Sequence, residues 1–259
     1  MHMHDPSTFR MLVRNGGWQG SSAGVCDGYI QTNLVVVPNE NADAFRRFTE
    51  FNPKSCPVLD ELPPGAYHSL LAPDADVRTD VPRYRVYAPD GSYTLYQDVT
   101  SIWDDTMTGF LIGCSFTFEA ALEAAGLPLR HVEEKRNVPM YVTNVATEAV
   151  APFSGPLVVS MRPMMANRVA KAEQITARYP SVHGAPVHAG DPAALGINDL
   201  AAPDYGDAVS LNPGEVPVFW ACGVTPQQAL LNAGLRTAIT HDPGCMLVTD
   251  TPHEAYEHQ

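Results

Sequence analysis

The first half of the chain alternates apolar and polar segments at lengths typical of short strands and helices. Residues 34–38 form an apolar run that predicts a buried strand, and residues 40–51 carry phenylalanines spaced on one helical face. Residues 83–97 are rich in aromatic side chains on either side of a Pro-Asp-Gly-Ser turn, which predicts a hairpin. This half is therefore expected to contain both strands and helices.

The second half shows the same kinds of segment. Residues 156–162 predict another buried strand, and Pro163 is expected to open a helix that runs to about Arg178. The 23 prolines and 19 glycines of the chain predict long, rigid connections between these elements. We expect a mixed α+β (α/β) fold with two similar lobes.

Two stretches, 110–127 and 218–235, match each other without a gap when Cys114 is aligned with Cys222. The match includes a threonine and an Ala-Gly-Leu ending, and it sets Glu119 opposite Gln227. This self-similarity predicts a diverged internal duplication, although strand–turn–helix units also resemble one another without a common origin. The expected division is an N-terminal Gly-rich segment at 1–28, a first α/β lobe at 29–150 and a second at 151–259; the two lobes can intertwine.

Each matched stretch turns from an apolar strand into a helix at a cysteine. The first N–H groups of a helix lack helical partners and carry partial positive charge, so such a turn can bind a carboxylate and lower the pKa of a thiol. The small residues after each cysteine would let a ligand approach the backbone. The candidates are Cys114, Ser115, Cys222 and Gly223, with Cys114 also a catalytic candidate. Alternatively, both cysteines are buried small apolar residues.

Three further sites carry candidate charges or anion-binding loops. Glu119 could transfer a proton, or it could merely complement its own helix dipole. Arg162, at the end of a strand, suits a bidentate carboxylate contact, with a structural salt bridge as the alternative. The Gly-rich loop at 14–24 could form an anion nest, with Arg14, Gly16 and Gly17 as its candidates, or it could be a surface turn.

Polar clusters supply the remaining candidates. Residues 130–137 gather charges, with Glu134 and Asn137 as candidates, and the second half has Thr-His-Asp-Pro at the corresponding place, with His241 as a candidate. This recurrence indicates a shared cleft, although charge runs are usually solvated. His183 and His188 lack the spacing of a helical metal pair, so we expect no metal and assign His188 to acid–base work; a metal site made with His241 is the alternative.

The overall composition excludes some classes of protein. Acidic residues outnumber basic ones by 29 to 16, giving a net charge of −13, and Lys and Arg do not cluster, so we expect no nucleic-acid partner. Five cysteines without a C-x-x-C pair indicate reduced thiols. No apolar run approaches the roughly 20 residues of a membrane span, and the first residues lack a signal-peptide pattern. A cytoplasmic protein with no membrane partner is expected.

Long runs of residues resemble a known family. The chain is similar to the bacterial hydro-lyases related to mitochondrial D-glutamate cyclase, from residue 13 to about 250. The resemblance implies a lyase that removes water without a cofactor: in the mitochondrial relative, D-glutamate closes to 5-oxo-D-proline. It carries over no catalytic residues. The matching runs are VRNGGWQGS, RTDVPRYRVY, FLIGCSFTFEAAL, EEKRNVPMY, GPLVVSMRP, VHGAPVHAGDP, PVFWACGVTPQ and ITHDPG.

Such a cyclisation needs a base, an acid and donors that hold an oxyanion. We expect the two cysteine turns to hold oxyanion and carboxylate, Arg162 to bind the α-carboxylate, and protons to move through glutamate or histidine (Glu119, Glu134, His188 or His241). Elimination from a hydroxy acid would use the same carboxylate contacts. Two competing hypotheses are a non-catalytic binder of small carboxylates and a metal-dependent hydrolase that uses the loop histidines. A homo-oligomer is the default for a soluble enzyme.

Overall fold

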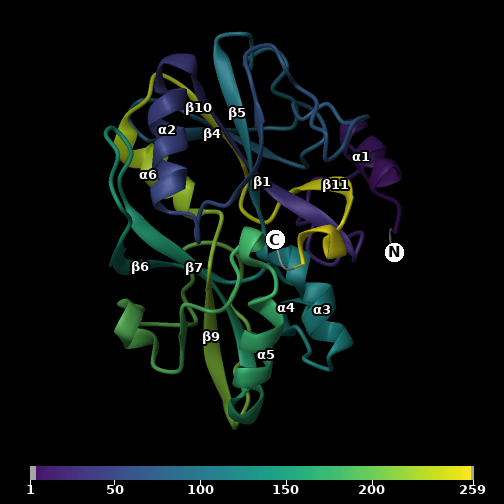
Figure 1. The fold of residues 1–259 in the computed structure, drawn as a ribbon, viewed down its shortest axis with the longest axis vertical. Coiled ribbons are helices and arrows are strands. Elements are labelled where there is room, and N and C mark those ends of the chain that lie inside the picture. Colours follow the sequence, from purple (N-terminus) through teal and green to yellow (C-terminus); the bar gives the residue numbers. More distant parts are fainter. Residues whose placement is uncertain (1–3, 258–259) are drawn as a thin grey trace.

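The computed structural model describes residues 4–257 and contains two antiparallel sheets stacked along the long axis of the molecule (Figure 1). The mixed α+β class is therefore confirmed. The larger sheet has the order β2-β5-β1-β10-β3-β4, with β11 paired to β1, and the smaller has the order β6-β7-β9-β8. Their strands are β1 (Tyr29–Pro38), β2 (Val58–Leu62), β3 (Tyr84–Tyr87), β4 (Tyr93–Tyr96), β5 (Met107–Gly113), β6 (Met140–Ala146), β7 (Pro156–Met165), β8 (His188–Ala189), β9 (Glu215–Ala221), β10 (Ala238–His241) and β11 (Leu247–Pro252).

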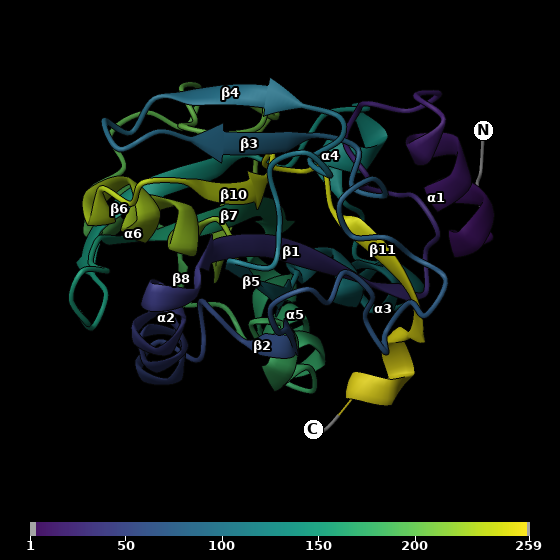
Figure 2. The same cartoon turned by 90° about the horizontal axis from the view of Figure 1, so that it is seen from above.

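Helices cover these sheets and close their ends. Viewed from above, β4, β3, β10 and β1 lie side by side, and α2 and α6 lie beside the larger sheet (Figure 2). In the smaller sheet, α5 and α3 pack over β9 through Trp220. The α-helices are α1 (Pro6–Arg14), α2 (Asn39–Phe51), α3 (Glu119–Ala124), α4 (Arg130–Glu133), α5 (Val169–Thr176) and α6 (Thr225–Ala233), and the 3₁₀ turns are η1 (Ser115–Phe118), η2 (Ala166–Arg168), η3 (Pro180–Val182), η4 (Pro192–Leu195) and η5 (His253–Tyr256).

The two sheets share one strand order and one register. The order β2-β5-β1-β11 of the larger sheet corresponds to β8-β9-β7-β6 of the smaller. Met107 opposes Pro38 in the first, and Glu215 opposes Met165 in the second. Met107 and Glu215 are also partners in the alignment that pairs Cys114 with Cys222, so β5 and β9 take equivalent places. The same backbone framework is thus built twice, whereas common ancestry of the halves stays a prediction.

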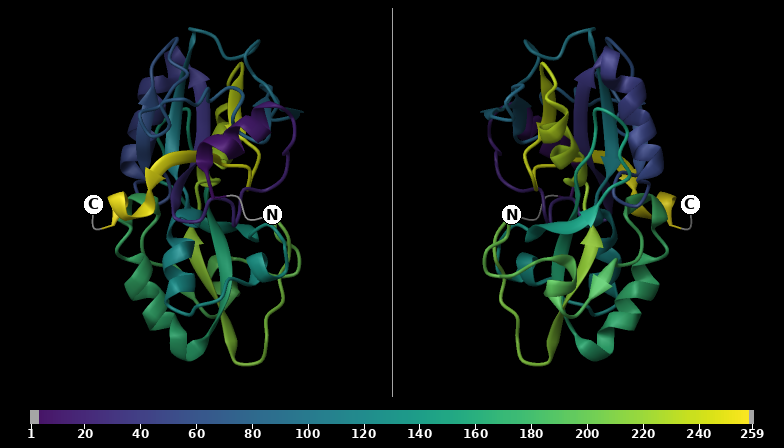
Figure 3. Two further views of the ribbon diagram at one scale, coloured as in Figure 1. Left: turned by 90° about the vertical axis from the view of Figure 1, so that its right-hand side faces the viewer. Right: turned by 90° about the vertical axis from the view of Figure 1, so that its left-hand side faces the viewer.

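The last strand of each framework is exchanged. β6 follows β5 and α3 along the chain but pairs with β7, while β11 follows β9 and α6 but pairs with β1. Strands β10 and β11 therefore belong to the larger sheet, although they lie in the segment 151–259. Figure 3 shows these C-terminal strands, in yellow, running beside β1. The halves are intertwined, and the lobe boundary at residue 150 stays a prediction.

Several elements confirm the sequence predictions and one does not. α2 covers the helix expected at 40–51, and β3 and β4 form the expected hairpin. The predicted helix start at Pro163 is wrong, because β7 continues to Met165. The helix itself, α5, begins only at Val169. Pro163 lies opposite Pro217 of β9, so two residues that lack an N–H face each other and neither leaves a donor unpaired.

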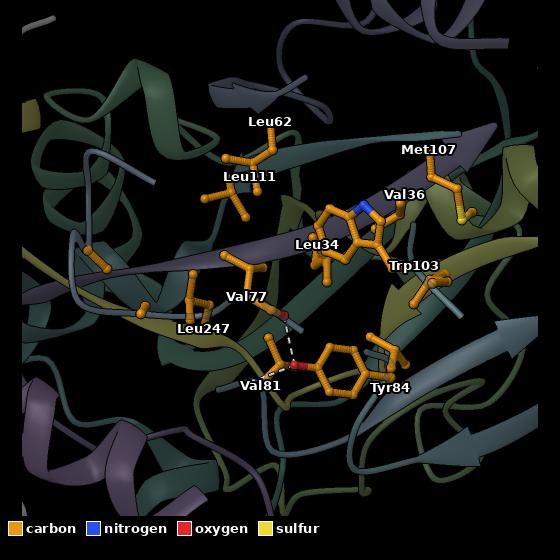
Figure 4. Packing of buried hydrophobic residues seen from close by; sticks show 14 residues of the cluster. Leu34, Val36, Leu62, Val77, Val81, Tyr84, Trp103, Met107, Leu111 and Leu247 are labelled. Atoms are coloured by element: carbon orange, nitrogen blue, oxygen red, sulfur yellow. Dashed lines mark hydrogen bonds between the residues drawn. The ribbon is translucent and has the colours of Figure 1, made fainter. Parts of the chain in front are cut away.

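The core of the larger sheet shows why its strands are so apolar. β1 is buried almost from end to end, because one face packs on α2 and α6 and the other on the segment between β2 and β3. Figure 4 shows this second face, where Trp103 lies over Val36 and Leu34. The hydroxyl of Tyr84 donates to the carbonyl of Val77 at 2.7 Å, so the loop is fixed to the sheet.

Among residues 4–257, the structure has no helix whose length and apolar character suit a membrane crossing.

Candidate functional site

A pocket of about 740 Å³ opens where the two sheets meet. Five segments line it: the Gly-rich loop, the start of β3, α4 with the turn that follows, the loop after residue 203, and the turn after β10. Polar and charged side chains dominate the wall, as a small, water-soluble ligand requires. The lining residues are Trp18, Ser21, Ala23, Gly24, Arg83, Arg85, His131, Val132, Lys135, Arg136, Asn137, Asp204, Tyr205, Gly206, Asp207, Asp242, Pro243 and Cys245.

Two arginines share one carboxylate in this wall. The Nε groups of Arg83 and Arg85 each donate to Asp242 at 2.6 Å, one to each oxygen. Arg83 directly precedes β3 and Arg85 lies within it, and Asp242 directly follows β10, which pairs with β3. The register of these strands therefore sets the three charges together. The shared carboxylate fixes both guanidinium groups and leaves this part of the wall positively charged.

Two more cations follow α4. Lys135 has a φ of +55°, a left-handed conformation at the position where helices usually end in glycine. Arg136 comes next and also lines the pocket. A lysine held in this conformation costs on the order of 1–2 kcal/mol, and strain of this kind concentrates at functional sites. The pocket lining therefore holds four cationic side chains against the three carboxylates of Asp204, Asp207 and Asp242, in a protein whose net charge is −13.

His131, on α4, is the buried imidazole of the pocket. Its exposed fraction is 1%, and its ring stacks on Phe116, with centroids 6.2 Å apart and planes 16° apart. Its Nε2 lies 3.2 Å from Oε1 of Glu119, which belongs to α3. A carboxylate behind an imidazole fixes the orientation of the ring and the nitrogen that carries its proton.

Glu119 is itself held by a buried arginine. The guanidinium of Arg162, fully buried, donates from Nε to Glu119 at 2.9 Å, from Nη1 to Ser160 at 3.1 Å and from Nη2 to Ser115 at 3.0 Å. Burial alone would raise the pKa of Glu119, but His131 and Arg162 outweigh it and lower that pKa below its usual value. Glu119 is thus a buried anion between two partners.

The two cysteine turns meet, but they do not form the expected anion site. Cys114 and Cys222 pack in one apolar cluster with Phe116, and neither lines the pocket. The expected lowering of thiol pKa is wrong: burial raises the pKa of Cys222 to about 11 and that of Cys114 further still. The N–H of Phe116 is already satisfied by the Cys114 sulfur at 3.5 Å, and Gly223 packs tightly against the amide of Asn33.

The remaining candidates are scattered. Ser115 and Arg162 reach the pocket only through Glu119 and His131, and Asn137 lines it directly, its amide donating to the carbonyl of Pro243. The rest lie outside the pocket. Arg14 pairs with Asp80, and Gly16 and Gly17 follow the end of α1. Glu134 accepts a hydrogen bond from Ser210, His188 contacts the carbonyl of Asp191, and His241 is buried against Leu34.

The alternative metal site finds no support in the geometry. Among residues 4–257, no three His, Cys, Asp or Glu side chains are gathered as metal ligands. His188 lies on the edge strand β8 of the smaller sheet, while His241 lies inside the larger one. Burial lowers the pKa of both His183 and His241 to about 4, so each is a neutral core histidine at pH 7.

Sequence reasoning missed the most central residues of the pocket. His131, Arg83, Arg85, Lys135 and Asp242 were not chosen as candidates, although they lie in the runs RTDVPRYRVY, RHVEEKRN and ITHDPG. The signal that pointed to them was the recurrence of polar residues after the two matched helices. That recurrence predicted a shared cleft, and the structure does bring the two segments to one pocket.

Comparison with known proteins finds similar sequences in one family. Residues 108–250 match the family model described as D-glutamate cyclase. A protein of Stutzerimonas stutzeri, named "Putative hydro-lyase", is 53% identical over 96% of this chain and 94% of its own length. The chain belongs to the D-glutamate cyclase family. A relative from Bacillus licheniformis, also named as a hydro-lyase, is 51% identical over 99% of both chains.

Further relatives agree with this assignment. A protein of Rubrobacter xylanophilus, also described as a hydro-lyase, is 55% identical over 96% of each chain. The family model and these names support the lyase class for the D-glutamate cyclase family member described here. A crystal structure of a nitrogen repressor-like protein from Methanococcus jannaschii aligns over 93% of this chain and 96% of that chain at 9% identity, with a TM-score of 0.40, a likeness too weak to define a shared fold.

Proposed function

We propose that this protein is a hydro-lyase that converts D-glutamate into 5-oxo-D-proline and water in the pocket between the sheets. The observation that carries the proposal is the combination of excess cations with one buried imidazole in the same wall. The family supports the reaction class. An amino acid with two carboxylates needs such cations, because the net charge of the whole chain would otherwise repel it.

The chemistry needs one group that moves protons. The amine nitrogen of glutamate attacks the side-chain carboxyl carbon, a C–N bond forms, and a C–O bond breaks. Two protons leave the nitrogen, and the departing oxygen takes up two protons as it becomes water. In the proposal, His131 accepts a proton from the ammonium group and returns one to the leaving oxygen.

The cations of the pocket would bind the substrate and stabilise the negative charge that develops on it. Arg83, Arg85, Lys135 and Arg136 would bind the two carboxylates and stabilise the oxyanion that forms when nitrogen attacks. Asp242 would keep the two β3 arginines in place, because it already binds both. No metal or cofactor enters this scheme, and every step uses side chains of the pocket.

The direct test is turnover of purified protein with D-glutamate, followed by chiral chromatography of the product. We expect 5-oxo-D-proline from D-glutamate and a much slower reaction with L-glutamate. His131→Gln should lower kcat by about 10²–10⁴-fold, the usual contribution of one acid–base group. His68→Gln is the matched control, because this histidine contacts the carbonyl of Ala75 and lies outside the pocket.

The outcomes separate the competing functions. Full activity in the His131→Gln protein would remove His131 from the scheme. Binding of D-glutamate without any product would favour the non-catalytic carboxylate binder, and product from a hydroxy acid alone would favour carbon–oxygen elimination.

A further inference from the structure

A buried chain of three charged or ionisable groups runs from the pocket into the smaller sheet. His131 stands at the pocket, Glu119 lies 3.2 Å behind it, and Arg162 lies behind Glu119 with contacts to two serines. The guanidinium also lies 5.4 Å from the ring centroids of both Phe118 and Trp220, so it is enclosed by aromatic rings as well. Among these groups, only His131 lines the pocket.

The same framework is built elsewhere in the chain without these charges. Gln227 occupies the position of Glu119 when Cys222 is aligned with Cys114. Val35 occupies the place of Arg162, since it opposes Phe110 in the larger sheet as Arg162 opposes Val218 in the smaller one. Gln227 and Val35 are also buried, yet neither is charged. Two copies of one framework thus use a neutral pair and an ion pair at the same two places.

Replacing a buried ion pair by neutral side chains is often without cost or even stabilising, because desolvation offsets the attraction between the charges. An ion pair present in only one of two equivalent frameworks therefore points to a task other than stability. The framework that contains it is the one whose carboxylate faces the imidazole of the pocket.

We propose that Glu119 and Arg162 are positioning residues that hold His131 in one tautomer for proton transfer. In this arrangement the Nε2 proton faces the Glu119 carboxylate, whose Oε1 lies 3.2 Å away, so Nδ1 is left without a proton and serves as the base toward the substrate. Arg162, with Ser115 and Ser160, keeps the Glu119 carboxylate ionised and pointed at the ring. The inference rests on the proposed function for its kinetic arm, but the tautomer itself can be measured without any substrate.

The first arm is spectroscopic. Protein labelled with ¹⁵N in its histidines gives imidazole nitrogen shifts that distinguish the two neutral tautomers, and the His131→Gln spectrum assigns the signal. We expect His131 to be the Nε2–H tautomer in the unmodified protein at neutral to mildly alkaline pH. The Nδ1–H tautomer there would overturn the proposal, whatever any variant does.

The second arm uses a variant that makes this site uncharged, as the equivalent site at Gln227 and Val35 is. Glu119→Gln alone leaves Arg162 buried without its carboxylate and is expected to lower Tm strongly. The double variant Glu119→Gln/Arg162→Met removes both charges with side chains of similar volume and should recover most of that Tm. We nevertheless expect its kcat to stay about 10²–10⁴-fold below that of the unmodified protein, with KM changed only a few-fold, because the imidazole is no longer oriented.

The two roles predict opposite results for the double variant. A merely structural ion pair predicts that activity returns together with Tm, and that the histidine tautomer does not change. Positioning predicts recovered Tm, low kcat and a mixed tautomer, because the glutamine amide can either donate or accept. Wild-type kcat in the double variant would overturn the inference. Absence of D-glutamate turnover in the unmodified protein would instead contradict the proposed function and leave the spectroscopic arm to decide the positioning role.

Discussion

Cys114 and Cys222 show how burial changes the chemistry of a side chain in this protein. A helix N-terminus favours a thiolate by roughly 0.3–1 kcal/mol at an exposed site. The pKa of Cys222 is raised from 9.0 to about 11, which corresponds to a penalty of roughly 3 kcal/mol on the thiolate, so desolvation wins. The cysteines stay neutral, so the proposed proton transfer is assigned to His131, the imidazole that reaches the pocket.

Lys135 places a positive charge in the pocket wall although its left-handed backbone conformation is unfavourable. Its φ of +55° suits glycine, so Lys135→Gly should raise the free energy of unfolding by about 1 kcal/mol or slightly less, since glycine also gains freedom in the unfolded chain. The same change removes a cation from the pocket, so KM for D-glutamate should rise. Thermal unfolding and steady-state kinetics on one preparation check both effects.

Lys135→Met is the control for that pair of effects, because it removes the charge and keeps a side chain in the left-handed conformation. It should raise KM without raising Tm. If Lys135→Gly left both Tm and KM unchanged, neither the strain nor the binding role would stand.

The individual residues of the site were the least predictable from sequence. Arg162 was chosen as a contact for the substrate carboxylate and Glu119 as a proton-transfer group, whereas the structure buries both behind His131. A sequence shows that a charge follows a strand, but not whether the ligand or another side chain meets it. Only the pairing of β3 with β10, two strands far apart along the chain, brings Arg83 and Arg85 to Asp242.

At the scale of elements, the end of β5 packs closely against η3. A methyl group added to Gly113 would lie 2.4 Å from the carbonyl oxygen of Ser181 and about 3 Å from Val182. Backbone cannot give way as a flexible side chain can, so Gly113→Ala should cost about 1–3 kcal/mol of stability. Gly20→Ala is the control, since its nearest neighbour would be 3.9 Å away. Chemical denaturation of both proteins gives the comparison, and equal midpoints would contradict this packing argument.

Elements whose pattern is local were the easiest to predict. α2 and the β3–β4 hairpin follow from helical spacing and from a turn sequence, both contained within a few residues. Pro163 misled the prediction because its place in β7 is permitted by a residue far along the chain, Pro217. The match between the two cysteine-bearing stretches was also visible in the sequence, but the exchange of β6 and β11 between sheets was not, since strand order depends on pairing across the whole chain.

For the whole molecule, the buried histidines predict a loss of stability in mild acid. His183 and His241 have their pKa lowered by burial from 6.5 to about 4, so the unfolded chain binds these protons between those values while the folded protein does not. The stabilisation is complete above about pH 6.5 and is lost as pH falls toward 4, by about 1.4 kcal/mol per pH unit for each histidine.

Unfolding curves measured from pH 7.5 to pH 4.5 check this dependence. His183→Gln should show a shallower fall in stability over that range than the unmodified protein, even if its stability at pH 7.5 is lower. An identical slope in the two proteins would show that other groups account for the acid sensitivity.

The exchanged terminal strands also bear on how the protein is made. Until the ribosome has translated the final segment of the chain, β1 lacks the neighbours that β10 and β11 provide, and Asp242 is not there to fix the two arginines. Premature termination before β10 would leave one edge of β1, a largely apolar strand, open to other chains. Catalytic competence and resistance to aggregation should therefore appear together, and late, during biosynthesis.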